Sequence, residues 1–320
     1  MAHESCRADP VTPSRRDVWI GMLLYPRHTL PTAAAPVLVA AGLARHDGVF
    51  AWQPALAAFL AGWLVQLGGV IADNYHNVVR HADDREHPAF IHALRTGVVA
   101  LAELRRTIAA CYLAAIVAGA SLVYVGGLPA LLVGLASIAA SLAYSSAPYP
   151  LGDHALGDLL FFVFFGVVSV TATYYVQAAA VLGPPFPLAV PAGAASFTAL
   201  VASLPIGALT TNILVIDNIR DLDFDREKGE TTLAVLIGAR WSRAEYVAVL
   251  LLAYAVPLWF WTRPGFGPGV LLPLLSAPYA ALVARWVIRA RTHDELVPMT
   301  PQAGQVLLAY AALLGLGFAV

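Results

Sequence analysis

The amino-acid sequence predicts an all-α, polytopic membrane protein with about nine transmembrane helices around a central cavity. Of its 320 residues, 59% are hydrophobic and only 12% are charged, whereas soluble domains carry about a quarter charged residues. Apolar stretches long enough to cross a bilayer recur along the whole chain. The net charge of −1 gives no indication of a nucleic-acid partner, so the lipid bilayer is the expected environment.

Nine apolar stretches, bounded by charged residues or by Pro and Gly, are the predicted spans. They cover approximately residues 28–46, 52–79, 103–125, 127–147, 157–181, 187–216, 243–262, 268–290 and 303–320. Each is near or above the ~20 residues that a helix needs to cross a bilayer. Gly126 and Gly127 are expected to form a tight turn between the third and fourth spans. Residues 1–17 are polar and are predicted to be a flexible cytoplasmic tail, which leaves residues 18–320 as one transmembrane domain.

The distribution of basic residues predicts the orientation of these spans. If the N-terminus is cytoplasmic and the nine spans alternate, all of the 19 Lys and Arg residues except Arg45 and Arg263 lie on the cytoplasmic side. Short cytoplasmic loops of membrane proteins carry such an excess of positive charge. The sequence therefore predicts an integral protein of the cell (inner) membrane with a cytoplasmic N-terminus and an external C-terminus.

Acidic residues gather where the sixth span ends. Asp217, Asp221 and Asp225 are four residues apart, which places their carboxylates along one face of a helix. Such like charges repel, and the cost rises near a membrane, so we expect a divalent cation to compensate them. The three aspartates are predicted Mg²⁺ ligands, and Arg220 and Lys228 are predicted contacts of a bound diphosphate. The alternative is a solvated helix end whose acids pair with the neighbouring Arg and Lys residues.

A second polar cluster follows the second span, at residues 72–84, which read A-D-N-Y-H-N-V-V-R-H-A-D-D. It ends at the same predicted face of the membrane, so we expect it to form the other half of a metal–diphosphate site. An amide oxygen can ligate Mg²⁺ but brings no charge. The candidate metal ligands here are Asp73, Asn74, Asn77 and Asp83, and the candidate phosphate contacts are Arg80 and Arg95.

Several motifs resemble those of one known family. The run D-N-I-R-D-L-D-F-D-R-E-K-G-E-T-T-L-A-V-L-I-G at residues 217–238 is similar to the second aspartate motif of the UbiA superfamily of intramembrane prenyltransferases. It is most similar to the branch that contains 1,4-dihydroxy-2-naphthoate prenyltransferases of menaquinone synthesis. Other segments that resemble the family are Y-P-R-H-T-L-P at 25–31, Y-S-S-A-P-Y-P-L at 144–151 followed by Gly157 and Asp158, and T-Y-Y-V-Q at 173–177.

The resemblance implies a nine-helix fold and transfer of a prenyl group from an isoprenyl diphosphate to an aromatic acceptor, with Mg²⁺ as the cofactor. Asp221 and Asp225 are then expected to be catalytic, and Tyr144 and Tyr174 to contact the substrate. Asp158 matches a family acid that could orient or deprotonate the acceptor; a structural interaction with its helix dipole is the alternative. Aromatic residues that could stabilise an allylic cation are Phe161, Phe162, Phe164, Phe165, Tyr174 and Tyr175.

The first aspartate motif departs from the family pattern N-D-x-x-D. The corresponding residues here are Asp73, Asn74 and Asn77, so the first pair is exchanged and one acid is an amide. This departure leaves a second hypothesis open, a membrane terpene cyclase that uses the diphosphate without an acceptor. A third hypothesis is a transporter with coupling carboxylates. Transporter sites lie near the middle of the membrane on broken helices, whereas these acids lie at predicted helix ends.

Overall fold

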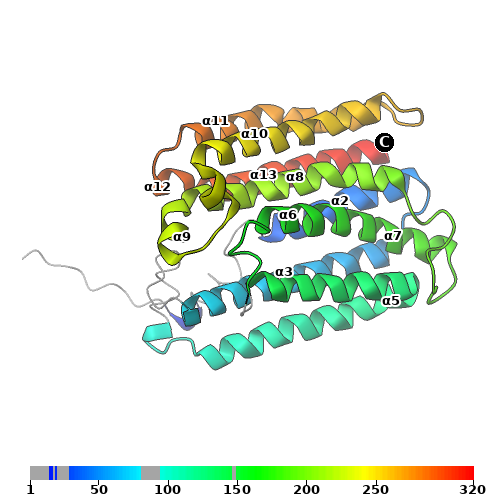
Figure 1. The fold of residues 1–320 in the computed structure, drawn as a ribbon. Coiled ribbons are helices and arrows are strands. Elements are labelled where there is room, and N and C mark those ends of the chain that lie inside the picture. Colours follow the sequence, from blue (N-terminus) through cyan, green and yellow to red (C-terminus); the bar gives the residue numbers. More distant parts are fainter. Residues whose placement is uncertain (1–13, 17–18, 20–28, 81–93, 146–148) are drawn as a thin grey trace, which may run out of the picture.

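The computed structural model describes residues 14–16, 19, 29–80, 94–145 and 149–320, and within these ranges it contains helices and no strand. Figure 1 shows the long helices side by side in one bundle. The predicted all-α fold is confirmed. The elements are α2 (Thr29–His46), α3 (Trp52–Arg80), α5 (Leu101–Ser145), α6 (Gly157–Phe161), η1 (Phe162–Val168), α7 (Ser169–Leu182), α8 (Phe197–Arg220), α9 (Leu222–Lys228), α10 (Leu233–Trp261), η2 (Pro268–Ser276), α11 (Ala277–Arg289), α12 (His293–Leu296) and α13 (Met299–Ala319).

Seven helical segments in the described part of the chain are long and apolar enough to cross a membrane. The chain is therefore an integral membrane protein. The seven are Trp52–His76, Leu101–Ser145, Gly157–Leu182, Phe197–Arg220, Leu233–Trp261, Pro268–Arg289 and His293–Ala319. Helix α2 is not among them, and α5 joins two helices across a kink, so the number of nine stays a prediction.

The kink in α5 lies at Gly127, where the sequence predicts a turn between two spans. Gly127 has a φ of 59°, and a Cβ atom there would lie 1.8 Å from the carbonyl oxygen of Pro187. Only glycine therefore fits this position. The hydroxyl groups of Tyr112 and Ser141 are 2.9 Å apart, so the two arms of α5 lie side by side, as Figure 1 also shows.

Helix α8 occupies the centre of the bundle. In the most apolar 18-residue stretch of α8, 78% of the residues are buried, whereas the corresponding share in α5 is 17%. Helix α8 is therefore a core helix and α5 is peripheral. Helix α8 packs against α10, η1, α13 and α7. Figure 1 shows α3 and α5 on one side of it and α10 and α11 on the other, with α9 and α12 at one end of the bundle.

One predicted helix boundary is wrong, and a second helix has an additional short arm before its predicted start. Helix α8 begins at Phe197 rather than near residue 187, and the hydroxyl of Ser196 caps it by accepting a hydrogen bond from the Ala199 N–H at 3.2 Å. The preceding segment holds four prolines within residues 184–191, which lack the N–H that a continuous helix needs. Helix α10 begins at Leu233 and is interrupted at Gly238, whose φ is 80° and ψ is 157°, so its long arm begins close to the predicted start at residue 243.

Candidate active site

A large cavity runs through the bundle, with a volume of about 1540 Å³. Pockets for drug-sized ligands usually measure about 300–1,000 Å³, so this cavity has room for a larger molecule. Its wall is mostly apolar, whereas six acidic and two basic side chains line its acidic mouth. These residues are Asp73, Asp153, Asp217, Asp221, Asp225, Glu230, Arg220 and Lys228. The excess of negative charge at this mouth favours cations.

The second acidic cluster forms one side of the acidic mouth. Helix α8 ends at Arg220, and Asp221 is the residue that joins it to α9, with a φ of −98° and a ψ of 4°. The expected single helix is therefore interrupted at Asp221. Backbone hydrogen bonds of 2.9 and 2.8 Å still connect Asp221 to Asp217 and Asp225 to Asp221. The four-residue spacing thus brings all three carboxylates to the same cavity.

Arg220 connects two of these carboxylates. Its Nη1 donates to Asp217 Oδ1 at 2.5 Å, its Nε donates to Asp221 Oδ1 at 2.8 Å, and its Nη2 donates to Asp221 Oδ2. The contact with Asp221 is therefore bidentate, which is the strong geometry for a guanidinium and a carboxylate. Thr300, at the start of α13, also donates to Asp217 Oδ1, at 2.7 Å.

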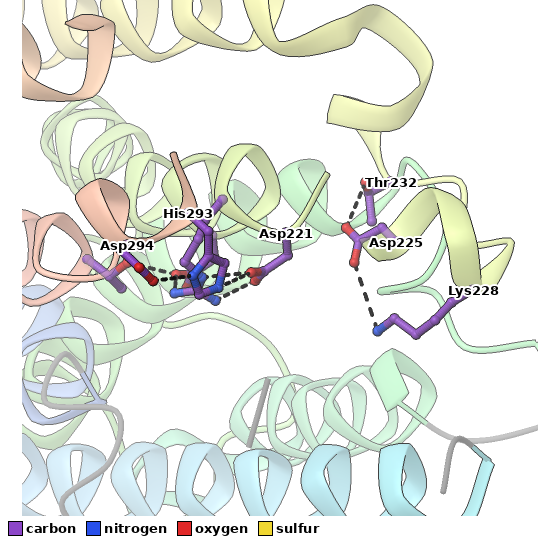
Figure 2. Close-up of polar contacts among 9 residues, drawn as sticks. Asp221, Asp225, Lys228, Thr232, His293 and Asp294 are labelled. Carbon is purple, nitrogen blue, oxygen red and sulfur yellow. Dashed lines mark hydrogen bonds and ion pairs between the residues drawn. The ribbon is translucent and has the colours of Figure 1, made fainter. Parts of the chain in front are cut away.

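Asp225 is held by residues of α9 and of the segment that follows it. Its Oδ2 accepts a hydrogen bond from the Thr232 hydroxyl at 3.4 Å, and Lys228 Nζ lies 3.9 Å from its Oδ1 (Figure 2). Lys228 Nζ is also 3.2 Å from Glu230 Oε1. The side chains of Lys228 and Asp225 are only 9% and 7% exposed, so their charges interact with little screening by water.

A histidine completes the second cluster. Figure 2 shows His293, at the start of α12, between Asp221 and Asp294. Its Nε2 lies 3.4 Å from Asp221 Oδ1, and its Nδ1 lies 3.3 Å from Asp294 Oδ1. Sequence reasoning missed His293, as it missed Thr232 and Thr300. His293 and Thr300 lie far from the aspartates in the sequence, and no local pattern marks them. Thr232 lies within the motif at residues 217–238, so that motif is the signal that could have identified it as a partner of Asp225.

The first polar cluster contributes two described side chains to the cavity. Asp73 and Asn74, on α3, both line it. Asn74 donates from Nδ2 to the Val70 carbonyl oxygen at 2.9 Å, while its Oδ1 is buried without a hydrogen-bond partner among the described residues. Asn77 and Arg80 belong to α3, but their side chains lie outside the described part, as does all of Asp83.

The remaining predicted site residues are divided between the cavity and the helix packing. Tyr144 lines the cavity, with its ring centroid 5.7 Å from that of Phe161. Tyr174 is 3% exposed and donates to Asp47 Oδ2 at 2.6 Å; it does not line the cavity. Arg95 is exposed at the end of a helical turn between α3 and α5, and it does not line the cavity.

Asp158 lies behind the cavity wall. It is 6% exposed, and its Oδ2 accepts a hydrogen bond from Asn218 Nδ2 at 3.4 Å. Asn218 lines the cavity, whereas Asp158 does not. The geometry therefore places Asp158 in contact with a cavity residue rather than in the cavity itself.

The aromatic side chains proposed for cation stabilisation are divided in the same way. Phe161, Phe164, Phe165 and Tyr175 line the cavity. Phe162 instead packs near Gly207, since a Cβ atom at Gly207 would lie 3.1 Å from the Phe162 ring. These phenylalanines belong to α6 and to η1, which is a π-helix. Short π-helical segments frequently occur at functional sites.

The donor atoms at the acidic mouth suit Mg²⁺, which prefers carboxylate and carbonyl oxygens. Among the described residues, no three His, Cys, Asp or Glu side chains are close enough to surround one ion. Mg²⁺ requires only one or two carboxylates where phosphate oxygens and water complete its shell. The carboxylates of Asp73, Asp217 and Asp221 and the unpartnered amide oxygen of Asn74 line one cavity, and one or two of these groups would suffice for an ion that is bound together with a diphosphate.

The same fold occurs in solved structures of UbiA homologues. The apo structure of a UbiA homologue from Aeropyrum pernix K1 has a TM-score of 0.68 and 19% sequence identity, over 90% of this chain and 96% of that one. A UbiA homologue from Archaeoglobus fulgidus, bound to DMAPP and Mg²⁺, has a TM-score of 0.54 and 12% identity, over 91% of this chain and 98% of that one. The fold is therefore that of UbiA-type intramembrane proteins.

Sequence comparison gives the family. Residues 33–299 match the UbiA prenyltransferase family. The 1,4-dihydroxy-2-naphthoate octaprenyltransferase of Escherichia coli (strain K12) is 30% identical over 303 residues, which cover 89% of this chain and 90% of the relative. The chain belongs to the UbiA prenyltransferase family and is an enzyme of the prenyltransferase class.

Proposed function

We propose that this enzyme transfers a prenyl group from an isoprenyl diphosphate to an aromatic acceptor within the membrane, with Mg²⁺ as its cofactor. The observation that carries the proposal is one cavity with an apolar wall and an acidic mouth. An isoprenyl diphosphate also has an apolar part and a charged part, because its long hydrocarbon chain ends in a diphosphate head group. The 1,4-dihydroxy-2-naphthoate relative supports an aromatic acceptor, and the homologue with DMAPP and Mg²⁺ supports the donor.

The acidic mouth would bind the diphosphate. Lys228 and Arg220 line it and can donate charge-assisted hydrogen bonds to phosphate oxygens. Asp73 from α3 and the acids of the second cluster would hold Mg²⁺. When bound, Mg²⁺ supplies a Lewis acid that neutralises the charge of the leaving diphosphate. Donors that are already oriented toward a leaving group stabilise its developing charge without reorganisation.

The apolar wall would protect the prenyl group after the diphosphate departs. Phe161, Phe164, Phe165 and Tyr175 line the cavity, and the faces of their rings attract cations. An apolar enclosure also excludes the water that would otherwise quench an allylic cation. Asp158 acts as a positioning residue in this proposal, because it contacts Asn218 and not the substrate.

The proposal includes an orientation in the membrane. The acidic mouth lies at the end of the bundle where α3 and α8 end, and most basic residues fall in the segments that this orientation places on the cytoplasmic side. The positive-inside rule therefore supports a cytoplasmic mouth. Water-soluble Mg²⁺ would then enter from the cytoplasm, whereas the prenyl chain lies at membrane depth.

One experiment tests the transfer and distinguishes it from cyclisation. The purified protein is incubated with Mg²⁺ and farnesyl or geranylgeranyl diphosphate, with or without 1,4-dihydroxy-2-naphthoate, and products are identified by mass spectrometry. We expect a prenylated aromatic product only when the acceptor is present. A cyclic hydrocarbon or alcohol formed without acceptor would instead support the terpene cyclase hypothesis and contradict the transferase.

The cavity also predicts two positions that limit the length of the donor. Gly62 on α3 and Gly134 on α5 line it, and a Cβ atom at either would have no neighbour within 4 Å. Gly62 precedes Asp73 of the acidic mouth by eleven residues. Gly134 precedes Tyr144 by ten, and the Tyr144 carbonyl oxygen accepts a hydrogen bond from the N–H of Gly152, the neighbour of Asp153 in the mouth. Each glycine therefore lies about 15 Å from the acidic mouth at 1.5 Å per helical residue. Only a long prenyl chain extends that far.

We therefore expect Gly134→Phe to reduce turnover of geranylgeranyl diphosphate by about tenfold or more, on the scale that one lost or blocked apolar subsite affects specificity. Turnover of geranyl diphosphate should change little, because its chain ends before Gly134. The measurement is kcat/KM for donors of increasing length. Gly267→Phe is the matched control, since Gly267 has equally open surroundings but lies outside the cavity lining. An equal loss for short and long donors would contradict this depth assignment.

A further inference from the structure

We propose that Arg220 is an exchangeable counter-ion, which occupies the acids in the absence of substrate and moves to the diphosphate when Mg²⁺ binds. This proposal rests on the proposed function, because it concerns how the same site is loaded. Its consequence is that Mg²⁺ and diphosphate bind with positive coupling, and that Arg220 opposes the binding of Mg²⁺ alone.

The first observation is that Arg220 already occupies the oxygens that a metal ion needs. It contacts both carboxylate oxygens of Asp221 and Oδ1 of Asp217. Thr300 donates to the same Asp217 oxygen. A Mg²⁺ ion that binds these carboxylates must therefore displace at least part of the guanidinium, since both cations require the same lone pairs.

The second observation is that the described part of the chain offers few further ligands to one ion. No three acidic or histidine side chains of the described residues surround a single point. Mg²⁺ has a strict octahedral shell and is usually completed by phosphate oxygens and water. The diphosphate thus supplies ligands that the described side chains do not. Mg²⁺ therefore binds most strongly when the diphosphate binds together with it.

The displaced guanidinium needs another acceptor within the site. The side chain of Arg220 is 17% exposed and that of Asp221 is 10% exposed, so the pair is poorly screened. A displaced guanidinium has only donors, and leaving it without an anion is costly in such a site. A diphosphate gives it a bidentate acceptor of the kind that arginine prefers, and Arg220 lines the cavity that would receive this group.

These steps define a reciprocal coupling between the two ligands. Mg²⁺ alone must break the pairs that Arg220 forms with Asp217 and Asp221 and brings no anion in their place, whereas the Mg²⁺–diphosphate complex brings one. Because such coupling is a property of both binding equilibria, each ligand increases the affinity of the other by the same factor. Removing the guanidinium should therefore affect the two affinities in opposite directions.

Two titrations of the full-length protein in detergent test this inference. Isothermal titration calorimetry measures the Kd of Mg²⁺ alone, and then the Kd of inorganic pyrophosphate at a fixed, saturating Mg²⁺ concentration. We expect Arg220→Gln to bind Mg²⁺ alone about tenfold more tightly than the unmodified protein and to bind pyrophosphate about tenfold more weakly, within the usual range of coupling between sites.

Arg226→Gln is the matched control. Arg226 lies on the same short segment, but it pairs at 3.3 Å with Asp223, whose side chain is 92% exposed, and it does not line the cavity. Both affinities should remain unchanged in this variant. Arg220→Lys keeps the positive charge but cannot form the bidentate contact with Asp221, so its Mg²⁺ affinity should lie between those of the unmodified protein and Arg220→Gln. It also provides the test if Arg220→Gln does not fold.

Three other outcomes are distinguishable. If the variants lose pyrophosphate affinity while the Kd of Mg²⁺ alone is unchanged, Arg220 is only a phosphate contact and the exchange is refuted. If both affinities fall, Arg220 has a structural role and the exchange is again refuted. If the unmodified protein binds no pyrophosphate in the presence of Mg²⁺, the proposed function itself fails at this site, and the exchange fails with it.

Discussion

Replacing Asp221 or Asp225 with Asn is expected to reduce prenyl transfer by at least about 100-fold, which is the usual effect of removing one group that stabilises a transition-state charge. Each change preserves the size of the side chain and removes one negative charge. Asp221 is the residue on which Arg220 and His293 converge. Asp225 is 5% exposed and holds Thr232 and Lys228. The measurement is kcat for product formation at saturating Mg²⁺.

Asp223→Asn is the control for this pair of variants. Asp223 lies between the two, on α9, but its side chain is 92% exposed and pairs only with Arg226 in the contacts described above. An exposed pair of this kind contributes little, so turnover should be close to that of the unmodified protein. Full activity in Asp221→Asn or Asp225→Asn would contradict the metal–diphosphate site.

The four-residue spacing of the aspartates predicted the second cluster because local geometry determines it. Residues four apart in a helix remain neighbours even where α8 gives way to α9 at Asp221, since the backbone hydrogen bonds continue through this residue. The turn at Gly127 was predictable for a similar reason, because the conformation of consecutive glycines between apolar runs is a local property. Short segments of the sequence were therefore sufficient to predict the aspartate cluster and the turn between the two arms of α5.

The residues that support the acids could not be predicted in this way. Thr300 and His293 reach the cluster from α13 and α12, more than seventy residues along the chain. Their positions depend on how α13 packs against α2 and α8, and no single stretch encodes that packing. Tyr174 shows the opposite case, because its motif suggested substrate contact whereas its hydroxyl group binds Asp47. The tertiary arrangement decides which side of a helix faces the cavity.

The packing of α13 against α2 gives the second prediction with a large expected effect. A Cβ atom at Gly42 would lie 2.1 Å from the carbonyl oxygen of Gly315, and one at Gly315 would lie 2.5 Å from that of Leu38. The two backbones therefore touch, as they do where small residues mediate the association of membrane helices. Gly42→Leu should separate α2 from α13, since backbone atoms cannot move aside as a flexible side chain can. Overpacking of this kind costs about 1–3 kcal/mol and occasionally more.

We expect Gly42→Leu to lower the temperature of unfolding in detergent and to reduce activity further than the lost stability explains, because α13 carries Thr300 and thereby orients Asp217. Gly119→Leu is the matched control for the unfolding temperature, since Gly119 also lies within a membrane helix but a Cβ atom there would have no neighbour within 4 Å. Fluorescence-detected size-exclusion chromatography after heating compares the two variants. Equal unfolding temperatures would show that α2 and α13 can separate with little loss of stability. The contact between these two helices would then not be what positions Thr300.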